Sequence, residues 1–343
     1  MRRVSARRFR LQRRARTEVG DYPVELAWAP DGKALVIAGG EGAIFWYGVD
    51  QPAAAPQPIG RHAGGALSVA WQPAGPLFAS SGQDGEVLLW DSRTRAARPI
   101  HAGADWPQQL AFSGDGRQLA VASGRQLHLF DTEGEAQHVF GPHPGTVAAL
   151  AWRPRRDELA AVFNGGARIY AADAAAAPRD LPWPGAALTA CWSPDGRVLA
   201  AGMQDGAVHF WYVDAGSDAQ MRGYASKVML TGWSANGRYL ATAAEALIVL
   251  WDFSGSGPEG TKPLQLAGHS ERVTQLACQP VGAHLASGSR DCRLLLWQPA
   301  QGGEPIDADL LAAEVVSLCW SRDGRQLAAA DRNGGLSVYA LER

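Results

Sequence analysis

Cysteines, metal-ligand pairs and long apolar runs are all scarce in this sequence. The 343 residues include four cysteines, none of them in a Cys-x-x-Cys pair, and no His/Cys spacing resembles a zinc site. No window of 18 apolar residues exists, and the N-terminus has no apolar core of a secretory signal. The sequence therefore predicts no metal site, no membrane insertion and a reducing, cytoplasmic location.

Common catalytic and nucleotide-binding motifs are missing as well. The sequence contains no Walker A loop, no Gly-x-Ser-x-Gly elbow, no His-Glu-x-x-His helix and no Gly-rich dinucleotide loop after a strand. These absences favour a protein that is not an enzyme and that holds no cofactor.

Charge is nearly balanced over the whole chain but uneven along it. Lys and Arg number 32 against 34 Asp and Glu, yet residues 1–16 contain eight arginines and no acid. This Arg-rich arm could bind nucleic acid or an anionic membrane, act as a targeting segment, or form a solvated tail or an edge strand. Arginine outnumbers lysine throughout the chain, which weakens any special meaning of the arm.

Glycine, proline and tryptophan are the residues that the sequence has in abundance. Glycine and proline number 40 and 21, and there are 13 tryptophans. High glycine and proline content is typical of a chain of short strands and tight turns rather than of a helical protein.

The tryptophans mark a unit that recurs eight times, at steps of 40–45 residues. The first aromatic position of the successive units holds Trp28, Trp71, Phe112, Trp152, Trp192, Trp233, Cys278 and Trp320. A second aromatic follows 18 or 19 residues later, at Trp46, Trp90, Phe130, Tyr170, Trp211, Trp251, Trp297 and Tyr339.

Each unit has the pattern of four short antiparallel strands. An alternating run such as 188–192 leads into an Asp-Gly or Asn-Gly corner. A strand of small residues follows, as in 285–289, and then a β-branched and aromatic strand, as in 87–90. A weaker fourth strand precedes the next unit. One such sheet cannot bury both of its faces, so the eight sheets are expected to stack.

These units resemble the WD-repeat β-propeller family, in the form found in bacterial WD-repeat proteins. The family dipeptide stands at Trp90-Asp91 and Trp251-Asp252, and Gly268-His269 opens another unit in the family manner. The resemblance implies an all-β propeller with eight blades of four-stranded antiparallel sheet. Seven blades, the commoner number, plus an extra partial repeat is the alternative.

The predicted domain organisation is one propeller, residues 17–343, preceded by the arm, residues 1–16. The last strong strand ends near Tyr339, which leaves too little chain for a fourth strand in the last blade. An unpaired edge would promote aggregation, and segment 9–17 is the one placed to cover it. The arm is therefore also a candidate for the closing outer strand.

The resemblance further implies a buried hydrogen-bond chain of His, Ser or Thr, Asp and Trp in a blade. Two units carry the complete set: His62, Ser80, Asp84 and Trp90, and His269, Ser287, Asp291 and Trp297. Blade five keeps Asp205 and Trp211 but has Trp183 and Ala201 in the other two positions. We interpret the His–Ser–Asp clusters as structural rather than as hydrolase triads, because burial would satisfy the polar groups mutually.

The family also implies a partner-binding surface at the narrower end of the propeller. Side chains six and four residues before the first aromatic, and the residue before the turn aspartate, are expected to face that end. From these columns the predicted partner-binding residues are Tyr22, Trp106, Gln108, Phe163, Lys227, Met229, Arg272, Arg290 and Arg332. The aromatics lie in blades one, three and four and the basic residues in blades six to eight.

We therefore predict a cytoplasmic, non-catalytic scaffold that is a monomer on its own and binds one or more partner proteins. The alternative is a factor that associates with nucleic acid or an anionic membrane through the Arg-rich arm. A third, less favoured alternative is an enzyme with a cofactor in the central channel, since quinone-dependent dehydrogenases have a similar shape.

Overall fold

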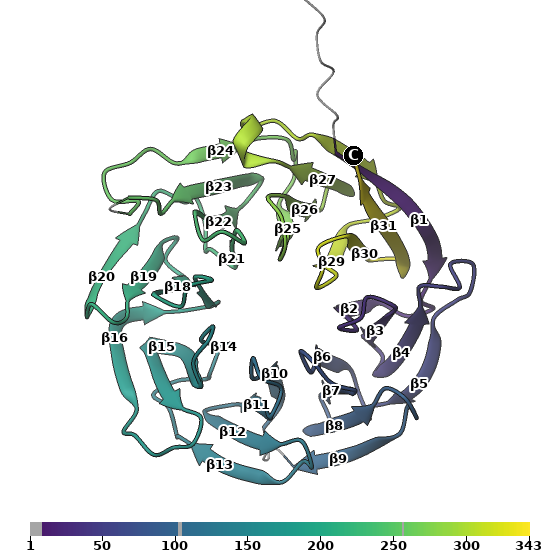
Figure 1. Cartoon of the computed structure of the whole chain (residues 1–343), viewed down its shortest axis with the longest axis horizontal. Helices are drawn as coiled ribbons and strands as arrows, with labels where there is room; N and C mark the ends of the chain where they lie inside the picture. The colour runs from purple at the N-terminus through teal and green to yellow at the C-terminus, as the bar shows by residue number, and fades with distance from the viewer. Residues whose placement is uncertain (1–8, 102–104, 256) are drawn as a thin grey trace, which may run out of the picture.

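Eight small antiparallel sheets stand as blades around a central channel (Figure 1). The computed structural model describes residues 9–101, 105–255 and 257–343. Over these residues the chain is all-β apart from one short helical turn, Pro299–Gln301. The prediction of eight four-stranded blades is confirmed, and the seven-blade alternative is wrong.

Successive strands of a blade run from the channel outward. Blades one to three contain β2 (Pro23–Trp28), β3 (Ala34–Gly39), β4 (Ala43–Gly48) and β5 (Gln57–Arg61); β6 (Ala66–Trp71), β7 (Leu77–Gly82), β8 (Glu86–Asp91) and β9 (Ala97–His101); and β10 (Pro107–Phe112), β11 (Gln118–Ser123), β12 (Gln126–Asp131) and β13 (Ala136–Phe140). Blades five and six contain β17 (Cys191–Trp192), β18 (Val198–Gly202), β19 (Val208–Tyr212) and β20 (Ser217–Met221); and β21 (Leu230–Trp233), β22 (Tyr239–Ala244), β23 (Leu247–Asp252) and β24 (Leu264–Leu266). Blades seven and eight contain β25 (Val273–Cys278), β26 (Leu285–Ser289), β27 (Arg293–Trp297) and β28 (Asp307–Leu310); and β29 (Val315–Trp320), β30 (Gln326–Asp331), β31 (Gly335–Glu342) and β1 (Arg10–Glu18).

Blade four differs because one continuous element supplies its two middle strands. This element is β15 (Glu158–Ala171), whose first half pairs with β14 (Ala149–Trp152) and whose second half pairs with β16 (Arg179–Ala186). Gly165 and Gly166 make the turn with φ of 111° and 129°, a conformation that side chains other than glycine rarely adopt. The hairpin here is one residue shorter than in blade five: 18 residues separate Trp152 from Tyr170, and 19 separate Trp192 from Trp211.

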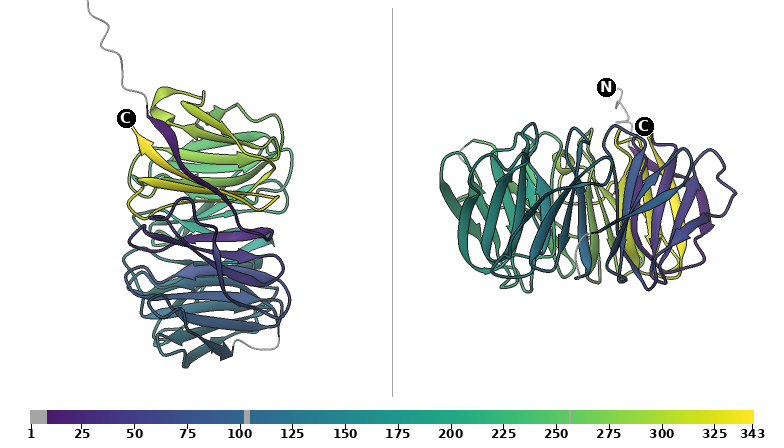
Figure 2. Two further views of the ribbon diagram at one scale, coloured as in Figure 1. Left: turned by 90° about the vertical axis from the view of Figure 1, so that its right-hand side faces the viewer. Right: turned by 90° about the horizontal axis from the view of Figure 1, so that it is seen from below.

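The last blade takes its outer strand from the beginning of the chain. Strand β1 pairs antiparallel with β31, so the described start of the chain lies beside its end (Figure 2). The boundary expected between residues 16 and 17 falls inside this strand. Outer strand β28 of blade seven also holds β1: Asp307 accepts the backbone N–H of Leu11 at 2.6 Å, and Asp309 accepts Arg13 Nε–H at 3.0 Å.

The first aromatic column joins neighbouring blades by hydrogen bonds as well as by packing. Its indole N–H groups donate to backbone carbonyls on the inner strand of the preceding blade. The pairs are Trp28 to Cys319 at 3.0 Å, Trp71 to Ala27 at 3.1 Å, Trp152 to Ala111 at 3.0 Å, Trp192 to Ala151 at 3.0 Å, Trp233 to Cys191 at 3.3 Å and Trp320 to Ala277 at 3.0 Å. Phe112 and Cys278 have no such donor, so this bond is made at six of the eight interfaces. The sequence pattern predicted the position of these residues but not their bond.

Candidate functional site

The His–Ser–Asp–Trp residues of blade two form a continuous hydrogen-bonded chain. Trp90 Nε1–H donates to Ser80 Oγ at 2.9 Å, and Ser80 Oγ lies 2.9 Å from His62 Nε2. His62 Nδ1 lies 3.1 Å from an oxygen of Asp84, which also accepts backbone N–H groups at the start of the blade. Each hydrogen bond joins a different pair of strands or loops. The hydrogen-bonded chain therefore fixes the loop before β6, which carries His62, relative to the third strand, β8.

Blade seven contains the same arrangement at nearly the same distances. Trp297 donates to Ser287 Oγ at 2.8 Å, Ser287 Oγ lies 2.8 Å from His269 Nε2, and His269 Nδ1 lies 3.1 Å from Asp291. Burial lowers the pKa of His269 below its ordinary value, which favours the neutral ring. We assign its proton to Nδ1, so that it donates to Asp291 while Nε2 accepts the serine hydroxyl.

The geometry of these clusters does not suit nucleophilic catalysis. Both serine side chains, Ser80 and Ser287, are fully buried, and each hydroxyl oxygen already accepts an indole N–H. A serine nucleophile needs an accessible oxygen beside a substrate carbonyl. The clusters therefore stabilise the fold.

Two other blades build comparable chains from different residues, which the sequence interpretation missed. In blade six, Trp251 donates to the Tyr224 hydroxyl at 2.7 Å, and that hydroxyl lies 2.6 Å from Thr242 Oγ1. In blade four, the Tyr170 hydroxyl lies 2.6 Å from Nε2 of His143. Tyr224 and His143 each stand nine residues before the first aromatic of their unit, as His62 does. This spacing in the sequence could have identified them as members of such chains.

Blade five fills the same space with stacked rings. His209 lies between Trp183, at 3.8 Å between ring centroids, and Trp211, at 4.4 Å. The His209 ring nitrogens and the Trp211 N–H are buried and have no hydrogen-bond partner among the described residues. Burial lowers the pKa of His209 to about 4, so this ring is neutral at pH 7.

Four of the predicted partner-binding residues are exposed at or just before the starts of inner strands. The exposed fractions are 44% for Tyr22, 53% for Trp106 and 47% for Met229, and Gln108 is also exposed. Inner strands run from one end of the ring to the other, so strand starts share one end. We call this end the strand-start end.

The predicted basic residues are present at the same end but are partly neutralised. Arg290 and Arg332 are exposed, and each has a nitrogen 3.2 Å from the carboxylate of Glu314. Arg272 is half-buried, and its Nη2 lies 3.8 Å from the sulfur of Met229. Lys227 is half-buried as well.

Phe163 is a correction to the predicted surface. Its side chain is only 4% exposed and packs on the His143 ring at 5.1 Å between centroids, so it cannot contact a partner. The short hairpin of blade four places Phe163 eleven residues after Trp152, whereas Gln83, Arg290 and other exposed members of its column lie twelve after theirs. A shift of one residue moves a strand side chain to the opposite face, and the exposed residue here is Asn164.

The channel opens into a cavity of about 360 Å³ beside the inner strands of five blades. Val24, Leu67, Gln108 and Val316, all from the column four residues before the first aromatic, line this cavity. The carboxylate of Glu25 also lines it and accepts the Ser68 hydroxyl and the Val69 N–H, each at 2.8 Å. Burial raises the pKa of Glu25. Within the described residues no group of His, Cys, Asp and Glu side chains could hold a metal ion.

The Arg-rich arm is described only in part, because residues 1–8 lie outside the described residues. Of its remaining arginines, Arg10, Arg14 and Arg16 are exposed on β1. The pairing of β1 with β31 shifts by one residue between Arg13 and Ala15, so Arg10 and Arg16 lie on opposite faces of the strand. Arg14 pairs with Glu342 of β31. Within the described ranges, no helix has the length and apolar character needed to cross a membrane.

A family model described as "WD domain, G-beta repeat" matches residues 57–91, 184–212 and 260–298. The first and last of these segments contain the two complete His–Ser–Asp–Trp sets, and the middle one contains the third strand of blade five.

Similar curated proteins carry roles in cell regulation in their names. "Autophagy-related protein 16" of Arabidopsis thaliana is 22% identical over 82% of this chain and 57% of its own length. "B-type cell cycle switch protein ccs52A" of Medicago truncatula is 26% identical over 67% of this chain and 50% of its own length. "Cell division cycle 20.1, cofactor of APC complex" of Arabidopsis thaliana is 25% identical over 78% and 61%. The chain thus spans about half to three fifths of these relatives.

The computationally designed Ika8 protein, known from a crystal structure, is similar in fold. The TM-score is 0.78 at 16% identity, and the match covers 96% of this chain and 99% of that protein. The matched repeat segments, the relatives and the eight-bladed ring agree with one another and support the WD-repeat β-propeller family.

Proposed function

We propose that this protein is a non-catalytic scaffold that binds a partner protein at the strand-start end of the ring. The observation that carries the proposal is the exposure of Tyr22, Trp106 and Met229, each close to half exposed, on one end of a rigid frame. Large aromatic and thioether side chains are enriched at protein interfaces. Their exposure to water is unfavourable in free energy, and a bound partner would bury them. Relatives named as a cell-cycle switch protein and an APC cofactor support a regulatory binding role.

Trp106 is the proposed anchor of this surface. It lies in the loop just before β10, outside both aromatic columns, and is the most exposed of the three side chains. A partner that buries this indole gains a desolvated contact near the channel mouth, where Gln108 supplies an amide for orientation. Arg290 and Arg332 lie toward the rim, where charge chiefly affects the rate of association.

The test is Trp106→Ala, compared with Val281→Ala. Val281 is 61% exposed but lies in the turn between β25 and β26, at the opposite end of the ring. With a partner captured from the native host and then purified, Trp106→Ala should weaken the measured affinity at least about tenfold, while Val281→Ala should leave it unchanged. Both variants should melt with the wild type. Equal affinities for the two variants would reject the strand-start end as the binding surface.

A second candidate function is binding of nucleic acid through β1, supported by the exposure of Arg10, Arg14 and Arg16 on this outer strand. Phosphate contacts of this kind weaken steeply as salt rises. Binding of a fluorescent duplex at several salt concentrations tests it. Charge reversal at Arg10, Arg14 and Arg16 should abolish binding that depends on this strand, and unchanged binding would reject the candidate.

A further inference from the structure

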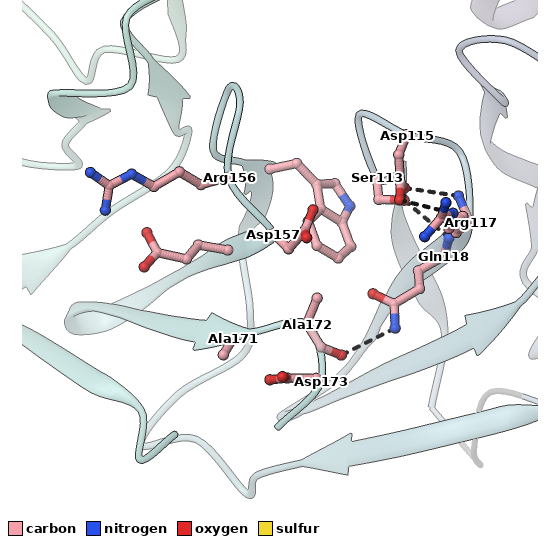
Figure 3. Close-up of a pocket in the computed structure, with 11 residues that line it drawn as sticks. Ser113, Asp115, Arg117, Gln118, Arg156, Asp157, Ala171, Ala172 and Asp173 are labelled. Atoms are coloured by element: carbon pink, nitrogen blue, oxygen red, sulfur yellow. Dashed lines mark hydrogen bonds and ion pairs between the residues drawn. The ribbon is translucent and has the colours of Figure 1, made fainter. Parts of the chain in front are cut away.

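A second cavity lies at the opposite end of the ring from Trp106, between blades three and four. Its volume is about 540 Å³, and its wall includes Ser113, Gln118, Trp152, Asp157 and Asp173 (Figure 3). Trp152 ends β14, Ser113 and Asp157 lie in the turns after β10 and β14, Gln118 begins β11, and Asp173 follows the end of β15. Trp152 is half-buried here, whereas Trp192, its equivalent in the next interface, is 7% exposed.

The interface between blades four and five shows what occupies the equivalent space. Arg153 lies there, 3% exposed, with its guanidinium carbon 4.9 Å from the centroid of the Trp192 ring. Its nitrogens lie 2.7 Å from Glu158 and 2.6 Å from Asp214, and Nε–H donates to the carbonyl of Gly196 at 2.7 Å. One arginine thus fills this interface by stacking on an indole between two carboxylates.

The two interfaces correspond position by position in the repeat. Trp152 stands where Trp192 stands, and Asp173 stands where Asp214 stands, three residues after the second aromatic. Gln118 replaces Glu158 as the polar side chain of the wall. The position of Arg153 itself, directly after the first aromatic, is taken by Ser113. The cavity therefore has the indole and one carboxylate of the Arg153 site but has a serine in place of the arginine.

The charges around the cavity favour a cation. Asp157 and Asp173 line it and form no ion pair within the described part of the chain. The Arg156 side chain points away from the other labelled residues in Figure 3 and pairs with Asp214 at 3.4 Å. Arg117 lies 3.5 Å from Asp115, with its side chain 85% exposed. Arg117 and Arg156 also line the cavity but pair with Asp115 and Asp214, so among the described residues Asp157, Asp173 and the Trp152 ring have no basic partner.

We propose that the cavity between blades three and four binds an arginine side chain of a partner protein. The guanidinium would stack on Trp152 and pair with Asp173, as Arg153 does with Trp192 and Asp214. Arginine fits better than lysine because its planar guanidinium both stacks on an aromatic face and binds a carboxylate through two N–H groups. This site uses the end of the ring remote from Trp106, so it extends the proposed function and does not depend on it.

The test labels the protein with 5-fluorotryptophan and follows the ¹⁹F resonance of Trp152, which Trp152→Phe identifies. The probes are N-acetyl-arginine methylamide and its lysine and citrulline counterparts. The arginine probe should shift the Trp152 resonance with an affinity at least about fivefold tighter than the lysine probe. The neutral citrulline probe should cause no saturable shift. The resonance of Trp192, already covered by Arg153, should not move.

Two variants change the site in opposite ways. Ser113→Arg restores the residue of the neighbouring interface, so it should itself move the Trp152 resonance and abolish the shift by the arginine probe. Asp173→Asn should weaken the probe at least about fivefold without filling the cavity. Melting curves check that both variants fold. A probe shift that is equal in wild type, Ser113→Arg and Asp173→Asn would overturn the proposal.

The source of the arginine is decided by a further comparison. Free L-arginine carries an additional ammonium and carboxylate that a residue within a polypeptide does not have. The proposal predicts that the capped probe and a Gly-Arg-Gly peptide with blocked ends bind at least as tightly as free L-arginine. Clearly tighter binding of free L-arginine would show a small-molecule site and overturn the assignment to a partner protein.

Discussion

Blades two and seven fill with a hydrogen-bonded polar chain the positions that blade five fills with stacked aromatic rings. In blade seven, Ser287 connects His269 to Trp297, and each of these three side chains has its hydrogen-bond partners. In blade five, alanine stands in the serine position, and His209 and Trp211 keep buried nitrogens without hydrogen bonds. Both blades nevertheless form the same four-stranded sheet. The comparison shows that the four-stranded sheet forms with or without the polar chain, and we expect the chain to add stability where it is complete.

The largest effect is expected from Ser287→Ala in blade seven. The change leaves His269 Nε2 and the Trp297 N–H buried without partners, which should lower the free energy of unfolding by roughly 3 kcal/mol. Urea denaturation measures the loss, and Ser80→Ala in blade two is the matched variant and should behave alike. A loss below about 0.5 kcal/mol in both variants would mean that the serine contributes no more to stability than the alanine that stands in its place in blade five.

Acid should lower the stability of the protein through His209 of blade five. The folded-state pKa of His209 is about 4 against an ordinary value of 6.5, so at pH 5 the unfolded chain binds a proton that the folded ring excludes. Stability should therefore fall as the pH falls from about 6.5 toward 4, with about 2 kcal/mol from this residue between pH 7 and pH 5.

The variant His209→Phe keeps an aromatic ring between Trp183 and Trp211 but cannot be protonated. It should reduce the loss of stability between pH 7 and pH 5 by that amount, measured by urea denaturation at each pH. Part of the pH dependence will remain, because burial also lowers the pKa of other histidines: His62, His143, His269 and His284. An unchanged pH profile would show that His209 is protonated at the same pH in the folded and unfolded chain.

Blade five should gain stability from the residue that it lacks. Ala201→Ser places a hydroxyl ten residues before Trp211, the spacing between Ser80 and Trp90. This hydroxyl can accept the unpaired Trp211 N–H, and the expected gain is about 1 kcal/mol in the free energy of unfolding. Ala200→Ser, one residue earlier on the other face of β18, is the control and should destabilise the blade, because it buries a hydroxyl away from that indole.

The smallest expected effect concerns the turn that carries Asp291. Cys292 adopts φ 64°, where the equivalent Gly85 of blade two has φ 80° and Gly206 of blade five has φ 77°. Cys292→Gly should relieve the left-handed strain and raise the melting temperature by about one or two degrees, for a gain near 0.5 kcal/mol. Gly85→Ala should lower it. A fall in melting temperature for Cys292→Gly would show that the thiol contributes more than the strain removes.

The sequence pattern was sufficient for the fold because the blades are defined by position. Two columns of aromatics at steps of 40–45 residues located all eight inner strands and all eight third strands, and a single cysteine at position 278 did not obscure the register. Phe163 was misplaced because a hairpin one residue shorter reverses which side chain is exposed. Such a difference is visible in the sequence only when each blade is counted separately.

The repeat pattern in the sequence does not predict which side chains of neighbouring blades contact each other. Arg153 meets Trp192 across an interface, some 40 residues along the chain, and the identity of the residue after the first aromatic varies from blade to blade. Its contact therefore depends on how two sheets pack, which the period alone does not specify. The hydrogen bonds from the indoles of the first column depend on the same packing.

The central claim, that a partner binds the strand-start end of the ring, is tested most directly by site-specific cross-linking. A benzoylphenylalanine residue placed at position 106 or at position 281 is activated by light in the native host, and the adducts are identified by mass spectrometry. We expect a partner adduct from position 106 and none from position 281. An adduct formed from position 281, with none from position 106, would contradict binding at the strand-start end and place the partner at the other end of the ring.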